Sequence, residues 1–112
     1  MAALAVQHES VQALNDQLRQ HGIGGTIVVT SGLQALGDDA VSLIIQAVAK
    51  FDALDHDNDP YGEHDFGAVQ VHGHRVFFKI DYYDVSLRYH SPDPTDPDVT
   101  SRVMTVMLPE EY

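Results

Sequence analysis

The chain has 112 residues and a mass of 12.3 kDa, which suits one compact domain spanning residues 1–112 with a modest core. It contains no cysteine, which excludes disulfide scaffolds, thiolate nucleophiles, zinc ribbons and iron–sulfur sites. Its 17 acidic and 6 basic residues give a formal net charge of −11, and a surface this negative repels nucleic acid and acidic lipids.

The N-terminal third of the chain predicts a helix followed by a strand. Residues 8–21 carry apolar side chains at helical spacing, and Gly22 is suited to end that helix. Residues 26–30 are a β-branched run bounded by glycine and serine, which is typical of a buried strand. The N-terminus lacks the basic segment and the long apolar run of a signal peptide.

A second helix and a long loop follow. Residues 41–51 carry a regular apolar stripe, which predicts a helix whose N-cap is supplied by Asp38 or Asp39. The longest uncharged apolar stretch, residues 40–49, is about half a membrane span, so we expect a cytoplasmic protein without membrane contact. Residues 52–65 are rich in Asp, Asn, Pro and Gly and predict a loop.

From residue 66 the hydrophobic period changes to alternation, which predicts strands at 66–71 and 75–83 joined by a two-residue turn at His72–Gly73. This register places one set of mainly apolar side chains on one face: Val69, Val71, Val76, Phe78, Ile80 and Tyr82. The opposite face presents Arg75, Phe77, Lys79, Asp81 and Tyr83. That second face serves either cross-strand stabilisation or function.

The C-terminal part predicts one more loop and one more strand. Residues 91–98 contain three prolines and predict a loop, whereas residues 99–108 are β-branched and apolar and predict the last strand. The order αβαβββ implies an α+β fold, in which two helices pack on one face of a largely antiparallel sheet.

The acidic residues fall into two groups. The first, within a window that holds no Lys or Arg, comprises Asp52, Asp55, Asp57, Asp59, Glu63 and Asp65. The second, answered only by Arg88, comprises Asp81, Asp84, Asp93, Asp96 and Asp98. These groups can attract a basic surface, or they can form a solvated face that promotes solubility. Eleven charges match about 19 Å of B-form DNA, so imitation of a phosphate backbone requires the acids to gather on one face.

The first acidic loop also suggests a metal site. Asp55, Asp57 and Asp59 resemble the start of an EF-hand, but Pro60 and Phe66 stand where that motif needs Gly and a bidentate Glu, so an EF-hand is excluded. A looser metal site, or a metal-dependent hydrolase, would use His56, Asp57, Asp59, Glu63, His64 and Asp65.

A structural role for the same loop is a third interpretation. Pro60, Gly62 and Gly67 would set its turns, while His64 and Asp65 would lock them by hydrogen bonds. Other chemistries lack their motifs. There is no Gly-x-Ser-x-Gly elbow, and the glycines before residue 26 precede a strand rather than a helix, so they cannot form a phosphate loop. No cofactor and no catalytic residue are predicted.

Four segments resemble an uncharacterised bacterial family, the domain of unknown function number 3768. They are NDPYGEHDFG at 58–67, KIDYYD at 79–84, SPDP at 91–94 and TSRV at 100–103. The resemblance extends from Asn15–Asp16 to Glu111–Tyr112, and Phe78 departs from it where Trp is expected. It implies no established activity or catalytic residue. It does imply a setting on plasmids and other mobile elements, beside genes suspected of anti-restriction roles.

The leading hypothesis is therefore a small acidic inhibitor from a mobile element that blocks a host nucleic-acid-targeting defence effector, of the CRISPR or restriction type. It would bind the basic nucleic-acid-binding surface of that effector, without binding nucleic acid or membranes itself. The predicted partner-binding residues are Asp55, Asp57, Asp59, Tyr61, Glu63, Asp65, Asp81, Tyr83, Asp84, Asp93, Asp96 and Asp98. The metal-binding protein or hydrolase is the alternative, and monomer and homodimer both stay open.

Overall fold

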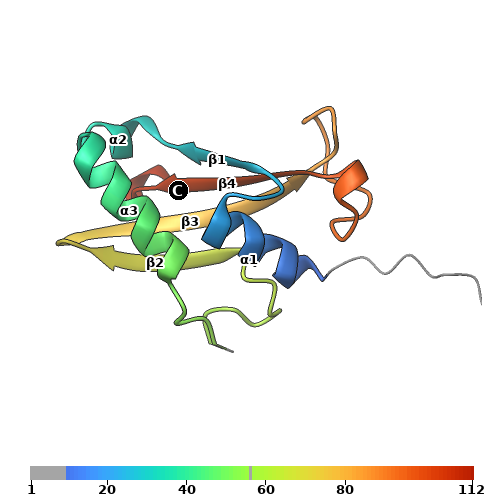
Figure 1. Ribbon diagram of the computed structural model, residues 1–112, viewed down its shortest axis with the longest axis horizontal. Coiled ribbons are helices and arrows are strands. Elements are labelled where there is room, and N and C mark those ends of the chain that lie inside the picture. Colours follow the sequence, from blue (N-terminus) through green and yellow to red (C-terminus); the bar gives the residue numbers. More distant parts are fainter. Residues whose placement is uncertain (1–9, 56) are drawn as a thin grey trace, which may run out of the picture.

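The computed structural model describes residues 10–55 and 57–112 (Figure 1). The helices are α1 (Val11–His21), α2 (Ser31–Gln34) and α3 (Asp38–Lys50). The strands are β1 (Thr26–Val29), β2 (Phe66–Val71), β3 (His74–Tyr83) and β4 (Ser101–Met107), and two short 3₁₀ turns span Pro97–Val99 and Pro109–Glu111. None of the helices in this part of the chain is both long and apolar enough to cross a membrane.

The four strands form one sheet in the order β1-β4-β3-β2. The two pairs that contain β3 are antiparallel, whereas β1 runs parallel to β4. Helices α1 and α3 lie on one face of this sheet (Figure 1). No α-helix of residues 10–55 and 57–112 covers the other face, where Tyr112 at the C-terminal 3₁₀ turn packs against Phe77. The core between the two layers contains Leu18, Leu33, Ile44, Val48, Val69, Val71, Val76, Phe78, Ile80, Met104 and Val106. The α+β prediction is confirmed, with α2 as an additional short helix.

The hairpin follows the predicted register. Gly67 pairs with Phe78 and Val71 pairs with His74, so β3 begins one residue earlier than predicted. His72 and Gly73 both have positive φ, at 47° and 81°. Two consecutive residues in this region make a type I′ turn, whose twist matches that of the flanking strands.

Two predictions about the first half of the chain were wrong. The run at residues 26–30 does not form a buried strand: β1 is an edge strand with alternating exposed and half-buried side chains. An apolar run cannot by itself distinguish a central strand from an edge strand whose one face is covered. The N-cap of α3 is Gly37 and makes no side-chain cap bond. Asp38 and Asp39 lie in the first turn instead, where negative charge favours the helix dipole.

Candidate functional site

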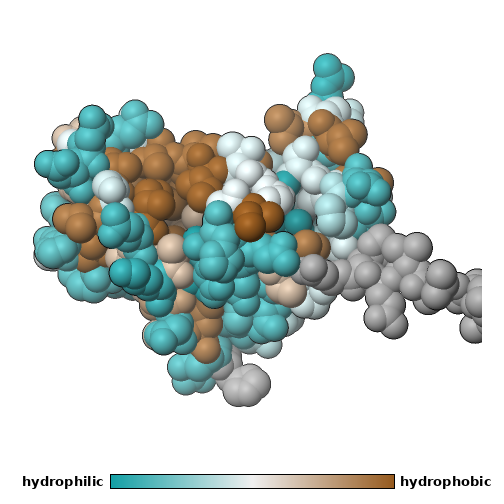
Figure 2. All heavy atoms as spheres, viewed as in Figure 1, coloured by the Kyte–Doolittle hydropathy of each residue, from teal (hydrophilic) through white to brown (hydrophobic). Residues whose placement is uncertain are grey.

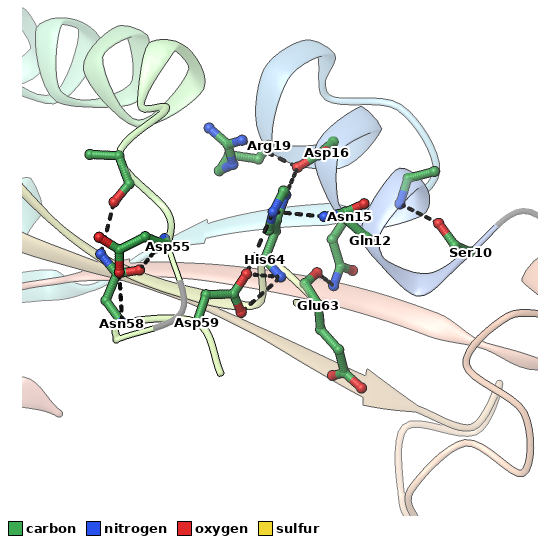
Figure 3. A network of polar contacts seen from close by, with 12 residues as sticks. Ser10, Gln12, Asn15, Asp16, Arg19, Asp55, Asn58, Asp59, Glu63 and His64 are labelled. Atoms are coloured by element: carbon green, nitrogen blue, oxygen red, sulfur yellow. Dashed lines mark hydrogen bonds and ion pairs between the residues drawn. The ribbon is translucent and has the colours of Figure 1, made fainter. Parts of the chain in front are cut away.

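The loop between α3 and β2 contains the first acidic group, and its outer part is held by its own polar side chains. One Asp55 carboxylate oxygen accepts the backbone N–H groups of Asp57 at 2.9 Å and Asn58 at 3.2 Å (Figure 3). The Asn58 side chain in turn accepts the N–H of Asp55 and donates to the carbonyl of Ala53, both at 2.8 Å. Asp55 is therefore a turn-forming residue, although its side chain stays exposed.

The middle of the loop turns back at Asp59. This side chain is 8% exposed, and its two carboxylate oxygens lie 3.2 and 3.3 Å from the backbone N–H of His64. The intervening Gly62 has φ 67°, and His64 itself has φ 58°. A non-glycine residue in this left-handed region is strained. The Asp59 carboxylate offsets that strain because it satisfies the His64 N–H that the turn exposes.

The His64 ring joins the loop to α1 (Figure 3). Its Nδ1 lies 2.8 Å from a carboxylate oxygen of Asp16, and its Nε2 lies 2.8 Å from the side-chain nitrogen of Gln12. The neutral tautomer with its proton on Nδ1 satisfies both contacts, because Nδ1 then donates to Asp16 and Nε2 accepts from Gln12. Nε2 also lies 3.5 Å from Asp59. The two ring nitrogens of His64 thus connect the loop to Gln12 and Asp16 of α1.

Arg19 connects α1 to the end of α3. Its Nη1 donates to the carbonyls of Val48 at 2.9 Å and Phe51 at 2.7 Å, and its Nη2 donates to Asp16 at 3.2 Å. The last carbonyls of a helix have no partner within the helix and carry its negative dipole end. Arg19, which is only 4% exposed, therefore satisfies the carbonyl groups at the end of α3, at the point where the loop begins.

A second polar network lies beneath the loop. Asn15 is fully buried; its Nδ2 donates to the Glu63 carbonyl at 2.9 Å and to the Tyr82 hydroxyl at 2.8 Å. Its Oδ1 accepts from Arg102 Nε at 2.8 Å, and Arg102 also donates to the carbonyl of Pro94. The Tyr82 hydroxyl donates to the Glu63 carboxylate at 3.1 Å. Burial raises the pKa of Tyr82 and lowers that of Arg102.

These two networks decide what the loop can present to a partner. Asp52, Asp55 and Asp57 are exposed, and the Tyr61 side chain is 91% exposed. A cavity of about 390 Å³ opens among the loop residues Leu54, Asp55, Asp59, Pro60, Tyr61, Gly62 and His64. The predicted contacts at Asp59, Glu63 and Asp65 are buried or half-buried. The first acidic group therefore combines exposed outer residues with inner residues that are largely covered by the rest of the fold.

The second acidic group is spread over the open sheet face and the loops between β3 and β4. Asp81 lies on the open face of β3 with Tyr83, and one of its oxygens is 3.4 Å from Lys79 Nζ. Three others organise local turns: Asp84 accepts from Ser86, Arg88 and Tyr89, Asp93 accepts from Thr95, and Asp96 accepts from the N–H of the exposed Asp98. The hydrogen bond from Ser86 lowers the pKa of Asp84.

The two acidic groups lie mostly in different parts of the structure, except that Asp81 is close enough to the first group to contribute to the raised pKa of Asp65. The loop at 51–65 lies beside α1, whereas the loops at 84–100 lie beyond the far end of β3 (Figure 1). A surface that imitates a continuous stretch of duplex would need both groups side by side. The structure places most of the second group away from the loop, so imitation of duplex DNA stays a prediction.

The metal interpretation stays a prediction. Within residues 10–55 and 57–112 no group of three or more His, Asp or Glu side chains is placed to hold a metal ion. His56, one of the six ligands predicted for such a site, lies outside the described residues. Of the rest, His64 has both ring nitrogens engaged by α1. Calorimetry with manganese, zinc and calcium on the parent and on His64→Ala tests this alternative directly.

The sequence alone did not assign roles to Asn15, Arg19 and Arg102. Asn15 and Arg19 hydrogen-bond to backbone carbonyls of the loop, and Arg102 hydrogen-bonds to Asn15. One signal for the first two was present in the helix pattern. Asn15 and Arg19 are four residues apart, and each directly follows a buried leucine of α1, Leu14 or Leu18. Two polar residues on the buried side of a helix require polar partners, because an unpaired buried polar group is costly.

Asp65→Asn is expected to stabilise the protein at neutral pH. Burial and the nearby Glu63 raise the pKa of the half-buried Asp65 carboxyl above its usual 3.8. A carboxyl whose pKa is higher in the folded state than in the unfolded state destabilises the fold when it is ionised, and this destabilisation disappears as the pH falls through the folded pKa. Because the group is partly solvated, we expect a gain below about 1 kcal/mol, or at most about 4 °C in Tm.

Thermal melting of Asp65→Asn and the parent between pH 3 and pH 7 measures this effect. The difference should be largest at pH 7 and vanish below the ordinary Asp value of 3.8. Asp52→Asn, at an exposed position of the same loop, is the control and should leave Tm unchanged. A stability difference that stays constant over the whole pH range would contradict the assignment, because it could not come from ionisation.

Comparison with known proteins identifies a family but no activity. A family model described as a protein of unknown function (DUF3768) matches residues 29–111, which confirms the resemblance. The matched range contains the loop, β2, β3 and β4, whereas α1 with Asn15 and Asp16 precedes it. Neither the curated proteins nor the solved structures contain a significant match.

Proposed function

Because the chain belongs to the DUF3768 family, whose function is unknown, we propose a function from its surface: it is a small acidic inhibitor from a mobile element. It acts in the cytoplasm on a host defence effector of the CRISPR or restriction type, binds the basic surface that receives nucleic acid, and blocks access of DNA. One observation carries this proposal. The exposed carboxylates of Asp52, Asp55 and Asp57 belong to a loop that is held by internal hydrogen bonds, and residues 52–65 contain no Lys or Arg.

The internal hydrogen bonds of the loop favour tight binding of a partner. A loop that is already ordered by internal hydrogen bonds loses little conformational entropy when a partner binds. The Asp55 turn and the Asp59–His64 contacts hold the loop in this way. The exposed carboxylates can then meet arginine or lysine side chains without rearrangement, and Tyr61 supplies an exposed aromatic ring of the type that often contributes strongly to interfaces.

The proposed contact residues fall into two classes by their environment. Asp55, Asp57 and Tyr61 are exposed and make the primary contact surface. The carboxylates of Asp59 and Glu63 hold the loop, and together with the half-buried Asp65 they add to its negative field. A secondary surface comprises Asp81, Tyr83, Asp84, Asp93, Asp96 and Asp98. Long-range attraction from both surfaces accelerates association, and added salt should weaken it because exposed charges are screened beyond about 8 Å at physiological ionic strength.

The test is phage plating efficiency in cells that carry an active CRISPR or restriction system, with and without this protein. The informative variant is Asp52→Asn, Asp55→Asn, Asp57→Asn. Asparagine at position 55 keeps the side-chain oxygen that accepts from Asp57 and Asn58, so the turn is preserved while the charge is removed. The parent should restore plating, and the triple variant should reduce that restoration at least tenfold.

The matched control is Asp38→Asn, Asp39→Asn, Glu110→Gln. It also removes three exposed negative charges, but from α3 and the C-terminal turn rather than from the loop. If the two triple variants inhibit equally well, the loop is not the contact surface. If the parent restores plating in none of several defence systems, the inhibitor proposal fails and the metal calorimetry becomes the next experiment.

A further inference from the structure

The outer edge of β1 offers backbone groups for pairing. Among the described residues, no strand lies beyond β1 on the side away from β4 (Figure 1). The N–H of Thr30, which directly follows β1, donates to the Val106 carbonyl of β4 at 3.1 Å. Because backbone groups of alternate residues in a strand point to opposite edges, the N–H and C=O groups of Ile27 and Val29 point outward.

This edge is only slightly protected. The side chain of Gln34 donates to the Val29 carbonyl at 2.8 Å and so covers one of the outward groups. Natural sheets protect their edges with charges, prolines, bulges or very short edge strands, because unpaired edges associate with other strands. β1 is short, at four residues, but its sequence Thr-Ile-Val-Val contains no charge and no proline.

The sequence around β1 contributes no charge in a chain whose net charge is −11, although the Glu111 carboxylate lies at the end of β1, where it accepts from the Thr30 hydroxyl and the Gly32 N–H. Residues 22–37 contain no Asp, Glu, Lys or Arg. Figure 2 shows hydrophobic atoms gathered over the region of β1, α2 and α3, whereas hydrophilic atoms dominate around the loop below. The opposite sheet edge differs, since β2 directly follows Asp65 and the acidic loop. We therefore expect weaker repulsion between two copies of this chain at the β1 edge than at the β2 edge.

Apolar side chains flank the β1 edge on both faces of the sheet. Ile27 and Val29 are half-buried on the helix face, where they pack against the core. Val28 is 43% exposed on the open face, where it lines a groove of about 470 Å³ together with Leu87, which is 59% exposed. A strand added at this edge would cover apolar surface as well as backbone groups.

We propose that β1 pairs with β1 of a second copy of this chain, antiparallel across a two-fold axis, so that the two sheets become one continuous sheet. The two-fold places the same neutral, apolar surface against itself, which is the arrangement of an isologous dimer. β1 and β2 lie at opposite edges of the sheet, so the acidic loops stay at the outer ends of the dimer. This proposal stands independently of the inhibitor function.

Salt dependence distinguishes the two proposals. Each copy carries a net charge of −11, so two copies repel at long range and added salt should strengthen the dimer. Binding to a basic partner should weaken under the same change. Sedimentation equilibrium of the full chain, at low and high salt, is expected to show a species of twice 12.3 kDa whose population rises with salt.

Val28→Glu tests the location of the interface. It places like charges near the two-fold axis at an exposed position and is expected to weaken the dimer at least tenfold. Leu43→Glu is the matched control, because Leu43 is 46% exposed but lies on α3, and it should leave the dimer intact. Thermal melting of both variants checks that each one folds.

Cross-linking gives an independent readout, because the chain has no cysteine. Val28→Cys should be linked into a covalent dimer by a short bismaleimide, whereas Leu43→Cys should not. A parent that sediments as a monomer up to millimolar concentration at high salt overturns the proposal. A dimer that survives Val28→Glu and is not captured through Val28→Cys overturns the β1 interface.

Discussion

Replacing Arg102 with methionine is expected to lower the free energy of unfolding by about 3 kcal/mol, within the range for a buried, hydrogen-bonded charge that loses its contacts. Arg102 lies in β4 and is 3% exposed. Its hydrogen-bond partner Asn15 lies 87 residues earlier in the chain. Its guanidinium donates to Asn15 and Pro94 and lies 5.3 Å from the centre of the Tyr82 ring. The substitution leaves the Asn15 side-chain oxygen and the Pro94 carbonyl without this donor.

Two effects oppose each other at this site. Burial of a cation is unfavourable, as the lowered pKa of Arg102 reflects, so removal of the charge recovers some free energy. The loss of two hydrogen bonds and of the contact with Tyr82 acts in the other direction, at about 1.5–3 kcal/mol for each bond made by a charged group and about 1 kcal/mol for the ring. The losses exceed the gain because the acceptors stay buried.

Urea denaturation of Arg102→Met and the parent measures the difference. Arg75→Met is the matched control, because Arg75 also lies over an aromatic ring, Phe77 at 5.5 Å, but is exposed on the open face. The control should change stability by less than about 1 kcal/mol. Equal effects of the two substitutions would show that the buried network contributes nothing specific.

The double variant Asn15→Leu, Arg102→Met sharpens this test. When both partners of a buried polar pair are replaced by apolar groups, the orphaned acceptor disappears and part of the stability returns. We therefore expect the double variant to be less destabilised than the sum of the two single variants. Strict additivity would show that Asn15 and Arg102 do not act as a pair.

Gly67→Ala is expected to destabilise the protein by about 2–3 kcal/mol through overpacking. A Cβ atom at Gly67 would lie 2.3 Å from a ring atom of Phe78 and 3.0 Å from a ring atom of Phe51. Phe78 is fully buried opposite Gly67 in the hairpin, with Phe51 packed edge-on at 5.9 Å and Arg19 5.6 Å from its centre. The ring therefore has no direction in which to move.

Gly73→Ala separates this steric effect from backbone strain. A Cβ at Gly73 meets no atom within 4 Å, but its φ of 81° is unfavourable for alanine, at about 1 kcal/mol. Phe78→Leu should partly relieve Gly67→Ala, because the shorter side chain makes room, and should give no relief to Gly73→Ala. Urea denaturation of the single and double variants decides this. A tolerated Gly67→Ala would contradict the close packing of Phe78.

The structure assigns a physical role to several residues of the segment that resembles the family. Asp59 and His64 close the turn, Gly67 admits the Phe78 ring, and the Asp65 carbonyl accepts the Ile80 N–H at 2.7 Å. These contacts hold the loop and start β2. Because these contacts fix the loop, they also fix the positions of its exposed carboxylates. A structural role for residues 58–67 is therefore compatible with a binding role for the loop.

The features that the sequence by itself determined are local ones. Alternation and a two-residue turn at His72–Gly73 were enough to predict the hairpin register, because a slip of one residue would exchange its two faces. The apolar stripe of α3 and the left-handed Gly22 after α1 were predictable for the same reason. Each depends on residues that are close together in the chain, where spacing translates directly into geometry.

Only the tertiary structure decided which residues support the acidic loop and which strand lies at the edge. Asn15 meets Glu63, Tyr82 and Arg102 across 48, 67 and 87 residues of sequence, and no periodicity encodes such contacts. β4, the last strand in the sequence, lies between β1 and β3, so β1 has a neighbouring strand on one side only among the described residues. Strand order and buried polar pairs depend on how distant segments pack, so one and the same β-branched run can be central in one sheet and exposed in another.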